Sequence, residues 1–261
     1  MRDDFDLITY NFPNTQDIRI IPISDVHLGS AECNREAFEK FVEDVLEEEN
    51  TYIILNGDLI DNATKSSKSD SYLATIPPFK AKEIMADILQ PLAKAGKILA
   101  ITEGNHEQRT ARESGEYLGY DIACRLGIED CYRPNACFVN ICFGDEKGNR
   151  QAGYKRPSYN LCVTHGSGVT LKRFQDFGAI IDNLDVSIIG HTHNPVITKN
   201  KKIYIDNRNK KISTKDYFTV VAGSWLHYGG YAIQKLYKPG SNCLEVITLK
   251  ANTKKVFVTM I

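Results

Sequence analysis

The sequence predicts a mixed α/β fold in which two β-sheets pack against each other. In the first half of the chain, dense β-branched runs alternate with segments of helical hydrophobic spacing. The second half consists mostly of strand-like runs, and no linker rich in Pro, Gly or Ser separates the two halves. Because 261 residues are ample for a buried core, we expect residues 1–261 to form a single domain.

The first half alternates predicted strands with predicted helices. The strands are expected at 18–24, 51–56 and 97–102, and the helices at 35–49 and 79–95. Pro91 should kink or end the second helix, and Gly96 suits its C-terminal cap. This order implies parallel strands joined by right-handed crossovers.

The second half is predicted to be richer in strands. Helical segments are expected at 113–125, which Gly127 would stop, and at 171–182. Strands are expected at 136–143, 159–164, 185–189, 196–205, 217–222, 244–250 and 255–261. Two sheets built in this way would bury their facing surfaces against each other.

Composition excludes several classes of protein. A net charge of -1 gives no global case for a surface that binds polyanions. The seven cysteines form no CxxC pair, so we expect buried thiols in a reducing cytosol. The acidic N-terminal segment is not followed by the apolar core of a signal peptide, and no apolar stretch could span a bilayer. We therefore expect a soluble, cytoplasmic protein without a membrane partner.

Five short polar motifs lie where predicted strands end. They are Asp25-Val26-His27, Gly57-Asp58-Leu59-Ile60-Asp61, Gly104-Asn105-His106-Glu107, Thr164-His165-Gly166 and Gly190-His191-Thr192-His193. Ligand sites of parallel sheets lie beyond the carboxyl ends of the strands, and Asp25, Asp58 and Asn105 occupy that position.

The residue types of these motifs suit a site for divalent metals. Carboxylate and amide oxygens bind hard cations, whereas imidazole nitrogen suits Mn, Fe, Co or Zn. Asp58 could bridge two ions, and Asn105 offers a neutral oxygen. Two metals about 3.5–4 Å apart can clamp the attacking and leaving oxygens of an in-line displacement and acidify a bridging water.

His106 follows a proposed ligand and is left over as the acid that protonates a leaving group. Asp61 could form a hydrogen bond with His106, which would orient the imidazole and favour its cationic form. The alternative for Asp61 is a cap of a helix or turn.

In combination, the motifs resemble those of the calcineurin-like metallophosphoesterases, a family that includes protein phosphatases, phosphodiesterases and nucleases. The family pattern is DxH, GDxxD, GNH(E/D), a lone His and GHxH, and all five occur in order between Asp25 and His193. The pattern is closest to the phosphodiesterases and nucleases. The resemblance implies an α/β fold that is a four-layer α/β/β/α sandwich of two mixed sheets flanked by helices.

The resemblance also implies a centre of two divalent metal ions, with Mn expected and Fe or Zn as alternatives. One metal would be held by Asp25, His27, Asp58 and His193. The second would be held by Asp58, Asn105, His165 and His191. His106 would be the catalytic histidine, with Asp61 as its orienting partner.

The chain departs from the Ser/Thr protein phosphatases at Asn62, where those enzymes have arginine after GDxxD. This difference weakens a protein-phosphatase interpretation. Arg109 and Arg112 could replace the missing phosphate clamp, or be ordinary solvated charges. His227, which follows a predicted strand, could face the substrate or be structural.

We therefore expect a dinuclear-metal hydrolase of phosphate esters, specifically a phosphodiesterase that acts on nucleotides or nucleic acid through a metal-bound hydroxide. A phosphomonoesterase acting on a nucleotide or protein, and a non-catalytic scaffold that binds a protein, are the alternatives. Basic and aromatic side chains after Asp58 could rim the site and hold phosphates and bases, or form a solvated loop. They are Lys65, Lys68, Lys80 and Lys82, with Tyr72 and Phe79.

Overall fold

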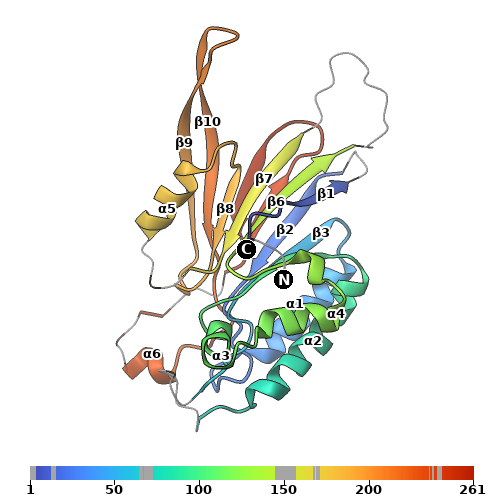
Figure 1. The fold of residues 1–261 in the computed structure, drawn as a ribbon, viewed down its shortest axis with the longest axis vertical. Helices are drawn as coiled ribbons and strands as arrows, with labels where there is room; N and C mark the ends of the chain where they lie inside the picture. The colour runs from blue at the N-terminus through green and yellow to red at the C-terminus, as the bar shows by residue number, and fades with distance from the viewer. Residues whose placement is uncertain are drawn as a thin grey trace.

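The computed structural model describes residues 4–12, 16–64, 67, 73–144, 157–166, 168, 171–234, 236, 238–239 and 243–261. Within these residues the strands form two six-stranded sheets, A and B (Figure 1). Sheet A contains, in spatial order, β1 (Ile8–Phe12), β6 (Ala136–Phe143), β7 (Ser158–Thr164), β8 (Val186–Ile189), β10 (Lys211–Val221) and β9 (Val196–Asp206). Sheet B contains β12 (Val256–Met260), β11 (Glu245–Leu249), β2 (Ile18–Ile23), β3 (Thr51–Asn56), β4 (Ile98–Thr102) and β5 (Tyr132–Arg133).

Both sheets are mixed. In sheet B, β2, β3, β4 and β5 are parallel, whereas β11 and β12 are antiparallel to their neighbours. In sheet A, β7, β8 and β10 are parallel, and β9 returns antiparallel to β10. The predicted parallel order of the first three long strands is therefore confirmed.

Helices cover the outer faces of both sheets (Figure 1). The outer face of sheet B packs against α1 (Arg35–Glu47), α2 (Pro78–Lys94) and α4 (Leu118–Leu126). Sheet A is covered by α5 (Leu171–Ile180), whose Phe174 packs against Ile189 and Val221. The shorter helices are α3 (Glu107–Ser114), α6 (Gly230–Gln234) and the 3-10 helix Glu129–Cys131. The order of layers is the α/β/β/α sandwich that the sequence predicted.

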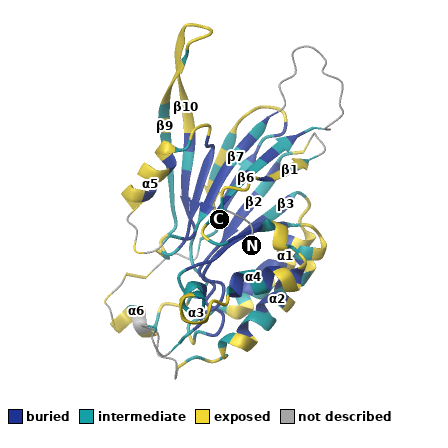
Figure 2. Cartoon of the chain, in the orientation of Figure 1, coloured by how far each residue is buried: buried dark blue, intermediate teal, exposed yellow. Residues whose placement is uncertain are grey.

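One of the two large core clusters lies between the two sheets, and Figure 2 shows the buried strands there. Ile20 and Ile54 of sheet B pack there with Val139, Val186 and Val220 of sheet A. The alternating burial of β6 shows how one face of that strand reaches this core. Burial of the inner faces holds the two sheets together. Strands of both sheets end at one common edge of the sandwich.

Predictions about single elements had different outcomes. The helix predicted at 79–95 is confirmed as Pro78–Lys94, and it ends within one turn of Pro91, whose ring and missing N–H oppose further helix. The helix predicted at 113–125 is two helices, α3 and α4, separated at Gly115, whose φ is 76°. The strand predicted from 217 begins at Lys211, because β10 extends as a hairpin beyond the core.

Two further features are the state of the cysteines and the character of the helices. All seven cysteines are free, and Cys137 and Cys162 are buried whereas Cys124 is exposed. Burial raises the pKa of the Cys162 thiol to about 12, which keeps this thiol protonated. Among the described residues, no helix combines the length and the apolar character that crossing a bilayer requires.

Candidate metal centre

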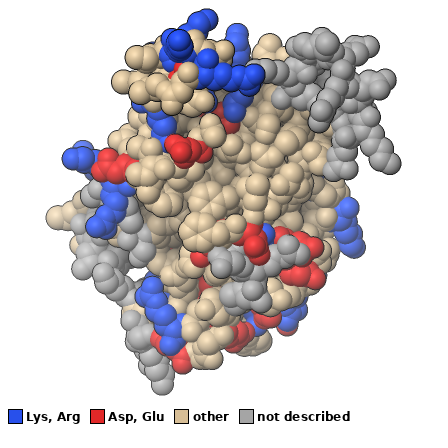
Figure 3. All heavy atoms as spheres, turned by 45° about the horizontal axis from the view of Figure 1, so that its top comes forward, with Lys and Arg blue, Asp and Glu red and all other residues tan. Residues whose placement is uncertain are grey.

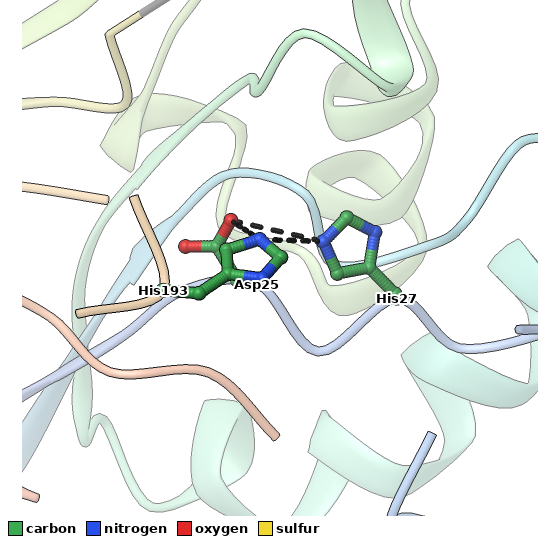
Figure 4. A group of neighbouring side chains, drawn as sticks. All are labelled: Asp25, His27 and His193. Carbon is green, nitrogen blue, oxygen red and sulfur yellow. Dashed lines mark hydrogen bonds and ion pairs between the residues drawn. The ribbon is translucent and has the colours of Figure 1, made fainter. Parts of the chain in front are cut away.

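The carboxyl ends of parallel strands bring the five motifs together. Asp25, Asp58 and Asn105 follow β2, β3 and β4 in sheet B, and His165 and His191 follow β7 and β8 in sheet A. Because both sheets present these ends at one edge of the sandwich, residues more than 160 positions apart become neighbours: His193 Nε2 lies 3.0 Å from Asp25 Oδ1, a sequence separation of 168. Figure 4 shows this pair with His27.

The chain leaves extended geometry at these positions. Asp25 and His27 have φ values of 55° and 51°, and His191 and His193 have 68° and 54°. The left-handed region is unfavourable for residues with a Cβ atom, so the surrounding structure must hold these conformations in place. In each of these two motifs, the turn directs the first and third side chains, Asp25 and His27 or His191 and His193, toward the same centre.

Among the described residues, the converging side chains form three groups, in each of which one ligand atom per residue lies within 4.8 Å of the others. The groups are Asp25 with His27 and His193, His27 with Asp58 and His106, and Asp58 with His165 and His191. Asp58 and His27 each belong to two groups. Of the imidazole nitrogens that pair with the Asp58 carboxylate, the closest is His165 Nε2, 3.1 Å from Oδ2.

Two buried oxygens favour a cation at this centre. Asn105 Oδ1 has no hydrogen-bond partner among the described residues, although a buried acceptor normally has one, and Asp25 Oδ1 is approached by imidazole nitrogens, His193 Nε2 at 3.0 Å and His27 Nε2 at 3.7 Å. Burial opposes ionisation, but the neighbouring histidines more than offset it and hold the pKa of Asp25 and Asp58 below the usual range. The donor set of ionised carboxylate, amide oxygen and imidazole therefore fits one or more divalent cations.

Glycines in the motifs permit close packing of the loops. A Cβ atom on Gly104 would lie 2.1 Å from Asp58 Oδ1, and one on Gly190 would lie 1.9 Å from Ser24 Oγ. Any side chain at these two positions would displace the carboxylate or its neighbour. The physical reason for glycine in GNHE and GHTH is thus the approach of backbone to the Asp25 and Asp58 region.

Glu107 joins two of the loops, a role that the sequence analysis did not assign. Its Oε2 accepts hydrogen bonds from the backbone N–H groups of Asp58 and Gly104, both at 2.9 Å. Its Oε1 accepts one from the N–H of Ile60 at 3.1 Å. Glu107 is 1% exposed, so this carboxylate fixes the loop that carries Asp58 against the loop that carries Asn105 and His106. The signal available in the sequence was its place in the motif Gly104-Asn105-His106-Glu107.

His106, a member of the second group, lies between the carboxylates of Asp58 and Asp61. Its Nδ1 donates to the backbone oxygen of Asp61 at 2.5 Å and lies 3.3 Å from Asp61 Oδ1. Burial disfavours the cation, but the carboxylates of Asp58 and Asp61 more than offset it and raise the pKa of His106. Since Nδ1 is held by Asp61, Nε2 is the nitrogen that faces the metal-ligand groups, 3.9 Å from Asp58 Oδ2.

The three predicted substrate-binding residues differ in position. Arg109 Nη2 lies 2.8 Å from His106 Nε2, and Nη1 donates to the backbone oxygen of Asp61 at 3.3 Å. Arg112 is exposed and donates to Gln108 on the same helix, so the structure does not bring it to the site. His227 is exposed, and its backbone N–H donates to the oxygen of Glu32.

Asn62 does not face the open side of the site. Its side chain donates to the backbone oxygen of His106 at 2.6 Å and to Thr110 Oγ1 at 2.9 Å. Asn62 is 2% exposed, so it anchors the turn at His106 from within. Arg109 is therefore the guanidinium that lies beside His106 at this edge.

The predicted basic and aromatic rim is only partly described. Lys65, Lys68 and Tyr72 lie outside the described residues. Lys80 pairs with Glu83, and Lys82 pairs with Glu116 and Asp121, so both charges are already matched. Phe79 is 66% exposed. The described part of this segment therefore contributes an exposed ring and no unmatched lysine.

A comparison with protein families agrees with this geometry. The family model for calcineurin-like phosphoesterases matches residues 18–195, which include every member of the three metal-ligand groups. No curated protein sequence matches the chain.

Proposed function

Because the chain belongs to the calcineurin-like phosphoesterase family, whose members are metal-dependent phosphoester hydrolases, we propose that it is a two-metal phosphodiesterase acting on nucleotides or nucleic acid. The observation that carries the proposal is that Asp58 belongs both to a group with His27 and to a group with His165 and His191. Asp25, His27, Asp58 and His193 would hold one ion. Asp58, Asn105, His165 and His191 would hold the other, with Mn expected and Fe or Zn as alternatives.

Divalent cations at this centre would neutralise charge on the phosphoryl group and supply an acidified water as nucleophile. The protein supplies the proton for the leaving oxygen. His106 is the donor in this proposal, because Nδ1 is held by Asp61 and Nε2, which Arg109 contacts in this structure, faces the candidate metal centre. The raised pKa of His106 keeps its acidic form populated near neutral pH.

Charge at the site favours a diester over a monoester. A phosphodiester carries one negative charge, whereas a monoester near neutral pH carries close to two. With Asn62 turned inward, Arg109 is the described cation beside His106, and Arg112 faces away. A single guanidinium matches the monoanion better than the dianion, which supports the diesterase proposal over a monoesterase.

The same geometry supports treating residues 1–261 as one domain. Asp25 and Asp58 come from sheet B, and His165, His191 and His193 come from sheet A. Neither sheet alone supplies either proposed set of metal ligands. Separation of the sheets into independent units would therefore separate the site.

A substrate panel with added Mn tests the proposal. We expect a higher kcat/KM for bis-p-nitrophenyl phosphate than for p-nitrophenyl phosphate, and cleavage of at least one of cyclic nucleotide, DNA or RNA. The two esters share a leaving group, so their ratio reports the charge of the phosphoryl group. A preference for the monoester would contradict the diesterase proposal. Metal-loaded protein that cleaves no phosphate ester would favour a scaffold.

A further inference from the structure

The hairpin of β9 and β10 projects beyond the sandwich, away from the candidate metal centre (Figure 1). Each strand has 11 residues, and at roughly 3.3 Å per residue they span about 36 Å. β9 begins three residues after His193, so the base of the hairpin is at the site and the turn is at the far end. The rest of the protein packs against only the half of the hairpin that lies nearer the site.

One face of the distal hairpin is an exposed aliphatic patch. Ile205 lies directly opposite Ile212, and Ile203 lies opposite Thr214. Side chains alternate along a strand, so the three isoleucines share one face. They are 77% (Ile203), 64% (Ile205) and 76% (Ile212) exposed. Nearer the base, this face continues into Phe218 and Val220, which pack into the core between the sheets.

The hairpin is also strongly basic. Residues 196–221 contain seven Lys or Arg and two Asp, in a chain whose net charge is -1. Lys199 pairs with Asp216, and Lys202 donates to backbone oxygens at the end of α5. Arg208, Lys210 and Lys211 at the turn are exposed and form no ion pair within the described part of the chain. Figure 3 shows Lys and Arg gathered at this end of the molecule.

We propose that the distal hairpin, residues 203–212, attaches the protein peripherally to an anionic lipid surface. Aliphatic side chains would enter the headgroup region while the cations at the turn contact lipid phosphates. The proposal concerns attachment and not spanning, and it replaces the expectation that the protein has no membrane partner. It is independent of the proposed phosphodiesterase activity.

Charge and side-chain type favour lipid over other occupants. A second copy would bring two strongly basic hairpins together, and like charges oppose that contact. A nucleic acid could contact the cations at the turn, but it would leave the exposed isoleucines unburied, and Lys215 Nζ already lies 3.9 Å from the centroid of the Tyr204 ring on which a base could stack. Lysines at 199, 201 and 202 protect the free edge of β9 from pairing with a strand of another protein.

Flotation with large unilamellar vesicles tests the proposal. We expect the full chain to float with vesicles of equal parts phosphatidylcholine and phosphatidylglycerol, and not with phosphatidylcholine alone. Replacing Ile203, Ile205 and Ile212 together by Thr retains β-branching and should weaken partitioning by at least about tenfold. Replacing Arg208, Lys210 and Lys211 together by Gln should weaken it at low salt and leave little further salt dependence.

Ile180→Thr is the matched control, because Ile180 on α5 is also 77% exposed and lies outside the hairpin. It should float as the wild type does. Unchanged turnover of bis-p-nitrophenyl phosphate in every variant reports an intact fold and separates this test from that of the activity. Absence of wild-type flotation overturns the proposal. So does an equal loss in Ile180→Thr, or a dimer in light scattering that the triple Thr variant abolishes.

Discussion

The two sides of the candidate metal centre are held in different ways. On the side of sheet B, Asp25, Asp58 and Glu107 are each at most 1% exposed, and one buried carboxylate fixes two loops through three backbone hydrogen bonds. On the side of sheet A, His165 is buried, but the His193 side chain is 37% exposed and the backbone N–H of His191 donates to Asp25 Oδ2. The centre therefore has a fixed side and an open side.

This difference separates two tasks. A proton donor must be positioned within a fraction of an ångström, which a buried and fully bonded frame provides. Substrate and solvent must enter, which requires ligands that are partly exposed. Substitutions on the fixed side should therefore lower kcat and the free energy of unfolding, whereas substitutions at the edge of the site should weaken substrate binding.

The largest expected effect is that of His106→Asn on the fixed side. Loss of the proton donor should lower kcat by roughly 10²–10⁴ for a diester with an alkoxide leaving group, such as a dinucleotide. The loss should be smaller for bis-p-nitrophenyl phosphate, because p-nitrophenolate needs little protonation to leave. Steady-state kinetics on both substrates and metal analysis of the variant measure this. Equal losses on both substrates, or a loss of bound metal, would contradict the role of His106 as acid.

Glu107→Ala should be the next largest. Three buried N–H donors would lose their acceptor, so the free energy of unfolding of the metal-free protein should fall by about 3–5 kcal/mol. Metal affinity should fall by roughly 10–100-fold, because the loops that carry Asp58 and Asn105 would no longer be joined. Urea denaturation and calorimetric titration with Mn measure the two effects. Glu113→Ala, on the exposed part of the same helix, is the control and should change the free energy of unfolding by less than about 0.5 kcal/mol. A similar change in both variants would contradict the role of Glu107 in fixing the two loops.

Glu245 supplies a pH-dependent test of how the two sides are joined. This residue of sheet B is fully buried and accepts a hydrogen bond from the N–H of Gly223, which follows sheet A. Burial raises its pKa to about 7. A carboxyl group with a raised folded pKa stabilises the fold below its unfolded pKa, near 4.5, and this contribution is lost as pH rises toward 7.

Glu245→Gln should therefore gain stability relative to wild type as pH rises. The difference in unfolding free energy between variant and wild type should shift by about 2–3 kcal/mol in favour of the variant between about pH 5 and about pH 8. Urea denaturation across this range measures the shift. A pH-independent difference would show that Glu245 is ionised in the folded protein.

Much of the fold was predictable because burial produces periodic patterns. The strand at Thr51–Asn56 and the strand at Ala136–Phe143 coincide with their predictions, since their apolar residues fill the core. α3 was not recognised, because Glu107 is its only buried residue. The strand predicted at 196–205 was confirmed as β9, but the outer part of β10, residues 211–216, was not recognised, because polar and basic residues there pair across the hairpin without entering a core.

Convergence of the motifs was predictable from strand order, whereas their support was not. Asp25, Asp58 and Asn105 follow neighbouring parallel strands, so their proximity follows from topology. The bonds of Glu107 depend on the three-dimensional approach of two loops, which no spacing in the sequence reveals. The inward turn of Asn62 toward Thr110 depends in the same way on a packed helix.

Arg109 gives the smallest expected effect. It tests where the fixed side of the centre ends, because its backbone lies on the fixed side and its guanidinium reaches the edge of the site. It contacts His106 Nε2, the atom that must approach the leaving oxygen, so substrate binding requires its guanidinium to turn toward the phosphoryl group. Arg109→Ala should raise KM for a diester by roughly tenfold with a smaller change in kcat, and Arg112→Ala should leave both unchanged. A fall in kcat at constant KM would instead mean that Arg109 only positions His106. Arg109 would then belong to the fixed side, and the residues that bind the substrate would lie beyond α3.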